Sequence, residues 1–291
     1  MLMKAMLICP SARPAVTPLS EFTPLAAVPL LGESLVEYWL THLALLGVKQ
    51  VRILADDRPE QIQALVDNGA RWGLTAEVTT ESRELTPAQA QIKYAHEFPN
   101  TAPENIIATL DHFPGSPELP LFTSYADFFA ALVAWMPKAK TIDRVGVHEL
   151  QPGIWVGLHV HISPDARLQA PCWVGHCAYV GAGATIGPNA VVEDRAFVEG
   201  GAEVIASVVG TDTFVGQLLA LQDSLALGGT LVNWKTSSCA VVPDAFMLCA
   251  LRRPVIAKHH ENFLDRIAEI YSRNKDDLQM FWKHFLMNKE G

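Results

Sequence analysis

The strongest hydrophobic pattern in the chain is a six-residue repeat in its second half. A large aliphatic residue recurs every six positions, and a small or modest residue stands four positions after each one. The aliphatic positions are Val156, Ile162, Leu168, Val174, Val180, Ile186, Val192, Val198 and Val204, and the small ones are Val160, Ala166, Cys172, Ala178, Ala184, Ala190, Ala196, Ala202 and Val208. A strand repeats every two residues and a helix about every 3.6, so neither explains this period.

A period of six predicts a left-handed parallel β-helix, in which three six-residue faces make one coil and stacked coils bury the apolar interior. The aliphatic residues then point inward, and the small residues fit near the tight corners. The period slips by one residue over 210–214 and resumes at Val215, Leu221 and Leu227, with Leu219, Leu225 and Leu231 four positions later. We therefore expect a fourth coil, with a bulge or a small loop at the slip.

The first 135 residues alternate short apolar strands with amphipathic helices. Strands are predicted at 5–9, 51–55, 76–79 and 106–110, and helices at 34–46, from 59 onward, at 87–96 and at 124–135. Such alternation implies a mostly parallel sheet with both faces covered and a ligand site beyond the carboxyl ends of the strands. The predicted fold class is α/β plus β: a truncated Rossmann-like domain over 1–145, the β-helix over 146–235 and a C-terminal extension over 236–291.

The C-terminal extension contains two amphipathic segments. One helical face holds Phe263, Leu264, Ile267, Ile270 and Tyr271, and another holds Leu278, Phe281, Trp282, Phe285 and Leu286. We expect these helices to cover an open end of the β-helix or the front domain. Docking of a partner protein is the second reading. Binding to a membrane surface ranks third. The polar face carries Asp276 and Asp277 with few lysines, which disfavours contact with anionic lipid.

The front domain resembles the sugar-1-phosphate nucleotidyltransferases, a family that includes mannose-1-phosphate guanylyltransferases and glucose-1-phosphate thymidylyltransferases. The resemblance lies in the stretches 3–8 (MKAMLI), 18–24 (PLSEFTP), 28–32 (VPLLG) and 35–39 (LVEYW), and becomes patchy beyond residue 73. Members of the family often carry the same β-helix behind the catalytic domain. The resemblance implies a nucleotide or a sugar nucleotide as ligand, magnesium as cofactor, and a role in surface-polysaccharide synthesis.

The chain departs from the family at its phosphate-binding loop. The family's first loop reads G-x-G-T-R, whereas residues 11–15 here read SARPA. Both glycines are lost, Pro14 removes an N–H donor, Ala15 replaces the arginine and Leu25 replaces the lysine of the family's P-K motif. The vestige of the nucleotide site is therefore Pro10, Ser11, Ala12 and Arg13. Arg13 reaching the phosphates from a shifted position is the alternative that would preserve activity.

One residue still matches a catalytic position. Asp111 follows the predicted strand 106–110, where the resemblance implies a magnesium-binding aspartate. The alternative is a carboxylate that caps the turn after the strand. Only residues 122–153 separate this region from the β-helix, so the sugar-binding half is truncated. We predict no catalytic residues and no cofactor, and expect magnesium only if the chain is an active nucleotidyltransferase after all.

A third hypothesis places acyl transfer on the β-helix. Acyltransferases of this fold use a histidine as general base, and His159, His161 and His176 lie on the repeat. All three are expected to point outward or to lie near corners, where histidines need no catalytic role. The front domain would also have no purpose under this reading. The favoured hypothesis remains a non-catalytic scaffold or regulatory component.

Composition narrows the class of partner. The 291 residues are 49% hydrophobic and 18% charged, with a net charge of −9, which disfavours nucleic acid and anionic lipid as ligands. Five cysteines without a C-x-x-C pair suggest reduced, buried thiols. The sequence lacks a signal-peptide pattern and a run of 18 apolar residues, so we expect a cytoplasmic protein without a membrane span. We expect a homo-oligomer that recruits a polysaccharide-pathway sugar transferase.

Overall fold

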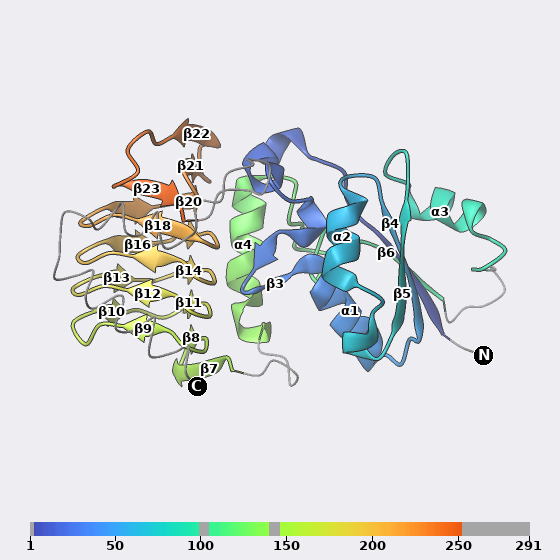
Figure 1. The fold of residues 1–291 in the computed structure, drawn as a ribbon, viewed down its shortest axis with the longest axis horizontal. Coiled ribbons are helices and arrows are strands. Elements are labelled where there is room, and N and C mark those ends of the chain that lie inside the picture. The colour runs from blue at the N-terminus through green and yellow to red at the C-terminus, as the bar shows by residue number, and fades with distance from the viewer. Residues whose placement is uncertain (1–2, 99–104, 140–145, 252–291) are drawn as a thin grey trace.

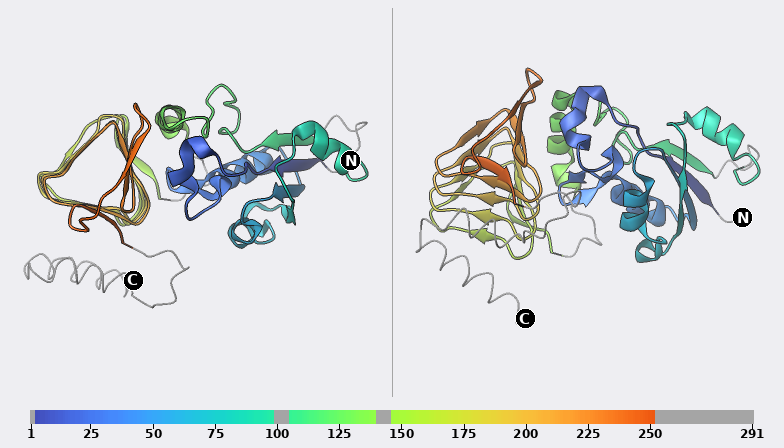
Figure 2. Two further views of the ribbon diagram at one scale, coloured as in Figure 1. Left: turned by 90° about the horizontal axis from the view of Figure 1, so that it is seen from above. Right: turned by 45° about the horizontal axis from the view of Figure 1, so that its top comes forward.

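The computed structural model describes residues 3–98, 105–139 and 146–251 (Figure 1). An α/β domain and a β-helix lie side by side, and helix α4 (Tyr125–Trp135) lies between them (Figures 1 and 2). No helix among the described residues is long and apolar enough to cross a membrane. The predicted C-terminal amphipathic segments 263–271 and 278–286 lie outside the described residues.

The α/β domain is built on a four-stranded parallel sheet. Its strands are β1 (Lys4–Ile8), β4 (Gln50–Ala55), β5 (Thr75–Thr80) and β6 (Ile106–Thr109), in the order β5-β4-β1-β6. A separate hairpin joins β2 (Pro29–Leu30) to β3 (Glu33–Ser34). The strand β1 lies between β4 and β6, so the order of the strands reverses beside it. The loop after β1 therefore opens at the switch point of the sheet.

Helices cover both faces of this sheet, as the alternating pattern predicted. They are α1 (Leu35–Leu45), α2 (Pro59–Val66) and α3 (Pro87–Lys93), with short 3₁₀ turns η1 (Pro14–Ser20), η2 (Leu25–Ala27), η3 (Ala70–Trp72) and η4 (Met136–Lys138). Ala5 and Leu7 face the core shared with α1 and α2, whereas Met6 and Ile8 face α3. Ser34 begins α1 with a capping box that includes Glu37.

The second half is a parallel β-helix with a triangular cross-section (Figure 2, left). Its coils are β8 (Ile154–Val156), β9 (His161–Ile162) and β10 (Arg167–Leu168); β11 (Cys172–Val174), β12 (Tyr179–Val180) and β13 (Thr185–Ile186); β14 (Ala190–Val192), β15 (Phe197–Val198) and β16 (Glu203–Ile205); and β17 (Val208–Val209), β18 (Thr213–Val215) and β19 (Ala220–Gln222). Each strand pairs in parallel with its counterpart one coil away.

Antiparallel strands finish both ends of the β-helix. At one end β7 (His148–Gln151) pairs with β8; at the other, β20 (Ser224–Leu227), β21 (Thr230–Asn233) and β22 (Ser238–Val241) form a meander, and β23 (Leu248–Ala250) pairs with β18. One face therefore becomes an eight-stranded sheet in the order β22-β21-β20-β17-β14-β11-β8-β7.

The interior of the β-helix follows the predicted repeat through Val204. The aliphatic residues and the small residues that follow them form one continuous core. Gly157 follows the inward Val156, and a Cβ at this position would lie 2.7 Å from the backbone nitrogen of His176 in the next coil. The stacking distance between coils therefore excludes a side chain at this position.

The predicted position of the slip was wrong. An unbroken period would place Gly210 opposite the inward Val192, but Val209 pairs with Val192 and Val208 with Val191, so the repeat shortens before residue 209 rather than over 210–214. A second shortening follows, because Ala226 pairs with Val209 and points into the core. Leu227 therefore does not continue the interior row, and the chain reverses just after it into β21. The core beyond Leu221 differs from the predicted one for this reason.

Serine hydroxyls compensate for the missing residue at both short corners. The Ser207 hydroxyl donates to the carbonyl oxygen of Ile205 at 2.7 Å and accepts from the Ser224 amide at 3.0 Å. The Ser224 hydroxyl donates to the carbonyl oxygen of Gln222 at 2.7 Å. Both serines are buried at positions where the earlier coils place Cys172 and Ala190. A hydroxyl in the small-residue row thus marks a shortened corner.

The eight-stranded sheet packs its outer face on the α/β domain. Trp155, Trp173 and Val191 belong to the same hydrophobic core as α4, and Phe129 of α4 stacks on Trp234 with ring centroids 4.5 Å apart. A charged contact reinforces this interface. The buried Glu193 carboxylate accepts from the amides of Leu31 at 2.6 Å and Gly32 at 2.8 Å in the turn between β2 and β3.

Candidate functional site

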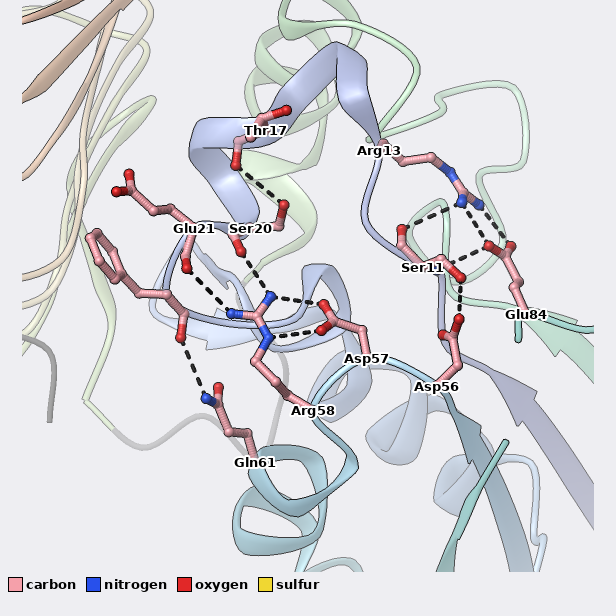
Figure 3. Close-up of polar contacts among 11 residues, drawn as sticks. Ser11, Arg13, Thr17, Ser20, Glu21, Asp56, Asp57, Arg58, Gln61 and Glu84 are labelled. Atoms are coloured by element: carbon pink, nitrogen blue, oxygen red, sulfur yellow. Dashed lines mark hydrogen bonds and ion pairs between the residues drawn. The ribbon is translucent and has the colours of Figure 1, made fainter. Parts of the chain in front are cut away.

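The candidate site lies at the carboxyl edge of the parallel sheet, where the loops after β1, β4, β5 and β6 meet. Ser11 and Arg13 follow β1, Asp56 follows β4 and Glu84 follows β5 (Figure 3). These side chains are brought together because the carboxyl ends of parallel strands lie at the same edge. This is the place where the sequence predicted the vestige of a nucleotide site.

The donors of the loop after β1 are bound to the protein's own carboxylates. The Ser11 amide donates to Glu84 Oε2 at 3.0 Å, and the Arg13 guanidinium binds both Glu84 oxygens at 2.6 and 2.7 Å. The Ser11 hydroxyl donates to Asp56 Oδ2 (Figure 3). Of the other two predicted residues, Pro10 is buried and Ala12 is exposed, and neither side chain carries a polar group. The residues that would hold a phosphate therefore hold Glu84.

The electrostatic environment of this loop is acidic. Hydrogen bonding to Glu84 raises the pKa of Arg13, and the charges of Glu84, Asp111 and Asp56 act in the same direction. Burial favours the neutral form of Glu84, but the contacts with Arg13 and Ser11 outweigh it and lower its pKa. Burial, together with Asp56 and Glu84, raises the pKa of the Cys9 thiol. A single guanidinium among three carboxylates does not attract an anion.

A second ion pair supports the segment behind the loop. Arg58 binds the Asp57 carboxylate with two contacts of 2.8 Å and donates to the Ser20 carbonyl oxygen at 2.8 Å (Figure 3). Arg58 adopts a positive φ of 44° as it precedes α2, which turns its side chain toward the end of η1. The guanidinium thereby joins the loop after β4 to the segment after β1.

Asp111 is tied to its neighbours in the chain. Its Oδ1 lies 2.6 Å from His112 Nδ1 and accepts from the Thr109 hydroxyl at 3.2 Å, while its carbonyl oxygen accepts from the Leu121 amide at 2.8 Å. Burial opposes ionisation, but the contact with His112 outweighs it and lowers the pKa of Asp111. These contacts match a carboxylate that organises the turn after β6.

The residues present do not fit a magnesium site. Within the described ranges no group of three His, Cys, Asp or Glu side chains is arranged to hold a metal ion. Asp111 is a single carboxylate whose Oδ1 already has two partners from its own turn. Magnesium in nucleotide-binding sites requires carboxylates together with substrate phosphates. The acidic surroundings of Arg13 disfavour those phosphates.

The three β-helix histidines make different contacts and share none that would assemble a catalytic base. His159 is exposed at a corner with a φ of 55°, and His161 stacks on Tyr179 with ring centroids 4.9 Å apart. His176 Nδ1 accepts from the Leu158 amide at 2.9 Å. In the neutral ring this contact places the proton on Nε2, which then cannot accept a proton from a substrate. The predicted outward and corner positions of these histidines are confirmed.

None of the five cysteines, all of which lie among the described residues, forms a disulfide bond, and the expectation that they are buried was only partly correct. Cys9, Cys172 and Cys249 are buried, whereas Cys177 and Cys239 are exposed. Cys177 stands at a corner with a φ of 55° and Cys239 on the strand β22. Both lie in apolar stretches of sequence, where neither the corner nor the sheet edge could be recognised.

Sequence reasoning missed Glu84, Asp56 and His112. A signal was available for the two carboxylates, because each follows a predicted strand and must therefore lie at the same edge as the loop 10–13. No pattern in the sequence indicates that Glu84 pairs with Arg13. His112 is adjacent to Asp111, and no pattern in the sequence marks it as the partner of that carboxylate.

No family model matches the chain. Among solved structures, it is similar to a variant of perosamine N-acetyltransferase from Caulobacter crescentus, whose crystal structure contains CoA and GDP-perosamine. The two sequences are 14% identical, and the match covers 67% of this chain and 97% of that chain with a TM-score of 0.19. A similarity at this level carries no inference about function. The parallel β-helix itself stands on the strand pairing described above.

Proposed function

We propose that this chain is a nucleotidyltransferase-like protein of sugar-nucleotide or surface-polysaccharide metabolism that does not transfer nucleotides itself. Its role is that of a scaffold or regulator. The observation that carries the proposal is the position of Glu84, which accepts hydrogen bonds from the Ser11 amide and the Arg13 guanidinium. These two groups are the donors that a nucleotide phosphate would need.

Other residues of the loop supply no substitute for these donors. Ala15 is exposed and Leu25 is fully buried, so neither of the two positions where the resemblance implies a cation carries one. Phosphate binding depends on closely placed N–H groups and cations, and a misplacement of about 1 Å costs on the order of 100-fold in rate. An active nucleotidyltransferase would require both the release of Glu84 and a rearranged loop.

The union of the two domains supports a scaffold role. α4 and the turn between β2 and β3 are packed on one face of the β-helix, and Glu193 fixes that turn through two amides. Such an assembly holds the surfaces of the two domains in a constant relation, as a scaffold requires. The proposed partners are further copies of the chain, a sugar transferase of the same pathway, and a nucleotide or sugar nucleotide.

An activity assay tests the proposal directly. Forward and reverse pyrophosphorylase reactions with magnesium, across the common nucleoside triphosphates and sugar 1-phosphates, should give no turnover above the rate without protein. Turnover that Asp111→Ala abolishes would overturn the proposal and establish the working nucleotidyltransferase. An Asp127→Ala variant, which changes a carboxylate at the start of α4, is the matched control.

A ligand screen separates the remaining alternative. Thermal stability measured with nucleoside triphosphates, sugar nucleotides and acetyl-CoA distinguishes a nucleotide binder from an acyltransferase. We expect stabilisation by a sugar nucleotide only if it displaces Glu84 from Ser11 and Arg13, and otherwise by none of these ligands. Stabilisation by acetyl-CoA, together with acetyl transfer that is lost in His176→Asn, would favour the acyltransferase and contradict the tautomer inferred for His176.

A further inference from the structure

The strand β22 forms an exposed edge of the eight-stranded sheet. All its residues, Ser238 to Val241, are exposed, and Val241 retains 75% of its accessible surface. Among the described residues β22 pairs with β21 alone, as the last strand in the order of the sheet. The hairpin of β21 and β22 projects at one end of the β-helix (Figure 2, right).

The hydrogen-bonding groups along this edge follow from the pairing with β21. The Val242 amide donates to the Gly229 carbonyl oxygen at 2.8 Å, so residue 242 faces β21. In an antiparallel ladder successive residues alternate in direction, so Ala240 also faces β21, whereas Cys239 and Val241 direct their N–H and C=O groups away from it. These two residues present a row of donors and acceptors at the open edge.

The opposite edge of the same sheet is protected, and β22 is not. On β7 the pairing is interrupted by a bulge between Glu149 and Gln151, and the strand carries His148 and Glu149. A bulge and charged side chains are two devices that prevent edge-to-edge association. The strand β22 reads SCAV, with neither a charge nor a proline. The strands at the edges of the other two β-helix sheets contain only two or three residues each.

We propose that β22 pairs antiparallel with β22 of a second copy of this chain, which joins two eight-stranded sheets across a two-fold axis. The contrast between the two edges selects this occupant. Pairing of β22 with β7 of another copy would meet the bulge and the Glu149 carboxylate and would generate an open filament. Pairing of β22 with itself uses one unprotected edge twice and closes. This proposal does not depend on the proposed function.

The backbone also selects the register. Ser237 has a φ of 56°, which ends the extended segment on its N-terminal side, and Pro243 lacks an amide on the other side. The register that uses only residues 238–242 places Ala240 opposite Ala240 of the partner. Cys239 then lies opposite the partner's Val241, and each such pair exchanges two hydrogen bonds. Ala240 occupies the non-hydrogen-bonded position, where opposing Cα atoms are about 4.5 Å apart.

Light scattering during size-exclusion chromatography tests the association with the full chain. We expect a mass twice that of the 31.8 kDa protomer. Val241→Pro removes an amide that points away from β21, so it should give a folded monomer. Val241→Thr retains that amide and should remain dimeric. Thermal melts of the Val241→Pro and Val241→Thr variants establish that each is folded.

Cross-linking tests the register without the Val241→Pro substitution. In a background of Cys177→Ser and Cys239→Ser, which removes the two exposed thiols, Ala240→Cys should form a covalent dimer on mild oxidation. Leu150→Cys on β7, in the same background, should not. A monodisperse monomer at high concentration, a dimer that survives Val241→Pro, or a cross-link through Leu150→Cys would each overturn the proposal.

Discussion

The interior of the β-helix and the carboxyl edge of the α/β sheet are stabilised by opposite means. In the β-helix, Val174, Val180 and Ile186 are fully buried among other aliphatic and small residues. At the sheet edge, Arg13 and Arg58 each engage a carboxylate, and all four side chains are partly exposed. The first region therefore depends on volume, whereas the second depends on charge in a solvent that screens it.

The difference explains why only one of the two regions can hold a ligand. The apolar side chains that fill the β-helix interior offer a ligand no charged or hydroxyl group. The sheet edge has polar groups that could exchange partners, although Glu84 and Asp56 occupy them in this structure. Exchanging a partner of the exposed ion pairs at the sheet edge should therefore cost little free energy. A change of side-chain volume inside the β-helix should cost more, because the neighbouring coils are packed against it.

Glu193 does not fit this contrast, because it is a buried charged residue of the β-helix. Its replacement is expected to have the largest effect on stability. Glu193→Ala removes the carboxylate that accepts from the buried amide of Leu31 and the partly buried amide of Gly32, which should destabilise the fold by about 3 kcal/mol. Urea unfolding followed by tryptophan fluorescence measures the loss. Glu203→Ala, at an exposed strand position, is the control and should be close to neutral. A loss below about 1 kcal/mol would mean that water reaches the turn.

Overpacking the interior tests the dependence on volume. Ala184 is fully buried at a corner, so Ala184→Leu should cost roughly 1–3 kcal/mol. The same change at the exposed neighbour, Ala182→Leu, should be nearly silent. Asn189 is unsuitable as a control, although its place in the repeat suggests exposure, because it is half-buried and has a φ of 56°. Equal melting temperatures for the two leucine variants would contradict the assigned phase of the coils.

The far face of the sheet supplies a smaller effect that depends on pH. Burial favours the neutral form of Glu81, but hydrogen bonds from Lys93 and Tyr94 outweigh it and lower its pKa below the usual 4.5. A carboxylate with a lowered pKa in the folded chain contributes stability that is complete above pH 4.5 and is lost as the pH falls further. The free energy of unfolding of Glu81→Gln should therefore vary less than that of the wild type between pH 6 and 3. Parallel curves would refute this contribution.

The smallest effect on stability is expected at the candidate site itself. The side chains of Arg13 and Glu84 are 36% and 26% exposed, so their coupling should be below about 1 kcal/mol. A double-mutant cycle with Arg13→Ala, Glu84→Ala and the double variant measures it. The coupling should also weaken at high salt. A coupling above about 2 kcal/mol would mean that the ion pair is a structural element like Glu193.

The repeat could be predicted because every coil places the same residue type in the same environment. Val174, Val180 and Ile186 repeat at a fixed interval, and the prediction failed only where the interval changed. At Ser207 a hydroxyl replaces a backbone group, so the coil closes one residue earlier and Val209 takes the inward position. The six-residue apolar pattern is regular both before and after a shortened corner. The sequence alone therefore does not show at which residue the coil is shortened.

The candidate site could be located but not completed from the sequence. The loop 10–13 was found by its place after the first strand and by its departure from the nucleotidyltransferase motif. The partner of Arg13 could not be found in this way, because Glu84 is 71 positions away and nothing in its neighbourhood resembles a site. Pairing between such residues is fixed by the register of β4 and β5 beside β1, which only the folded sheet defines.

The contact of Glu193 with Leu31 also bears on how the chain is made. The two residues are 162 positions apart, so the turn at Leu31 leaves the ribosome long before its acceptor exists. The apolar side of α4 likewise packs against Trp155, Trp173 and Val191, which are synthesised after it. The α/β domain therefore cannot complete its core before β14, the first strand of the third coil, has been synthesised. Until then a nascent chain exposes this apolar surface, which is the kind of surface that chaperones cover.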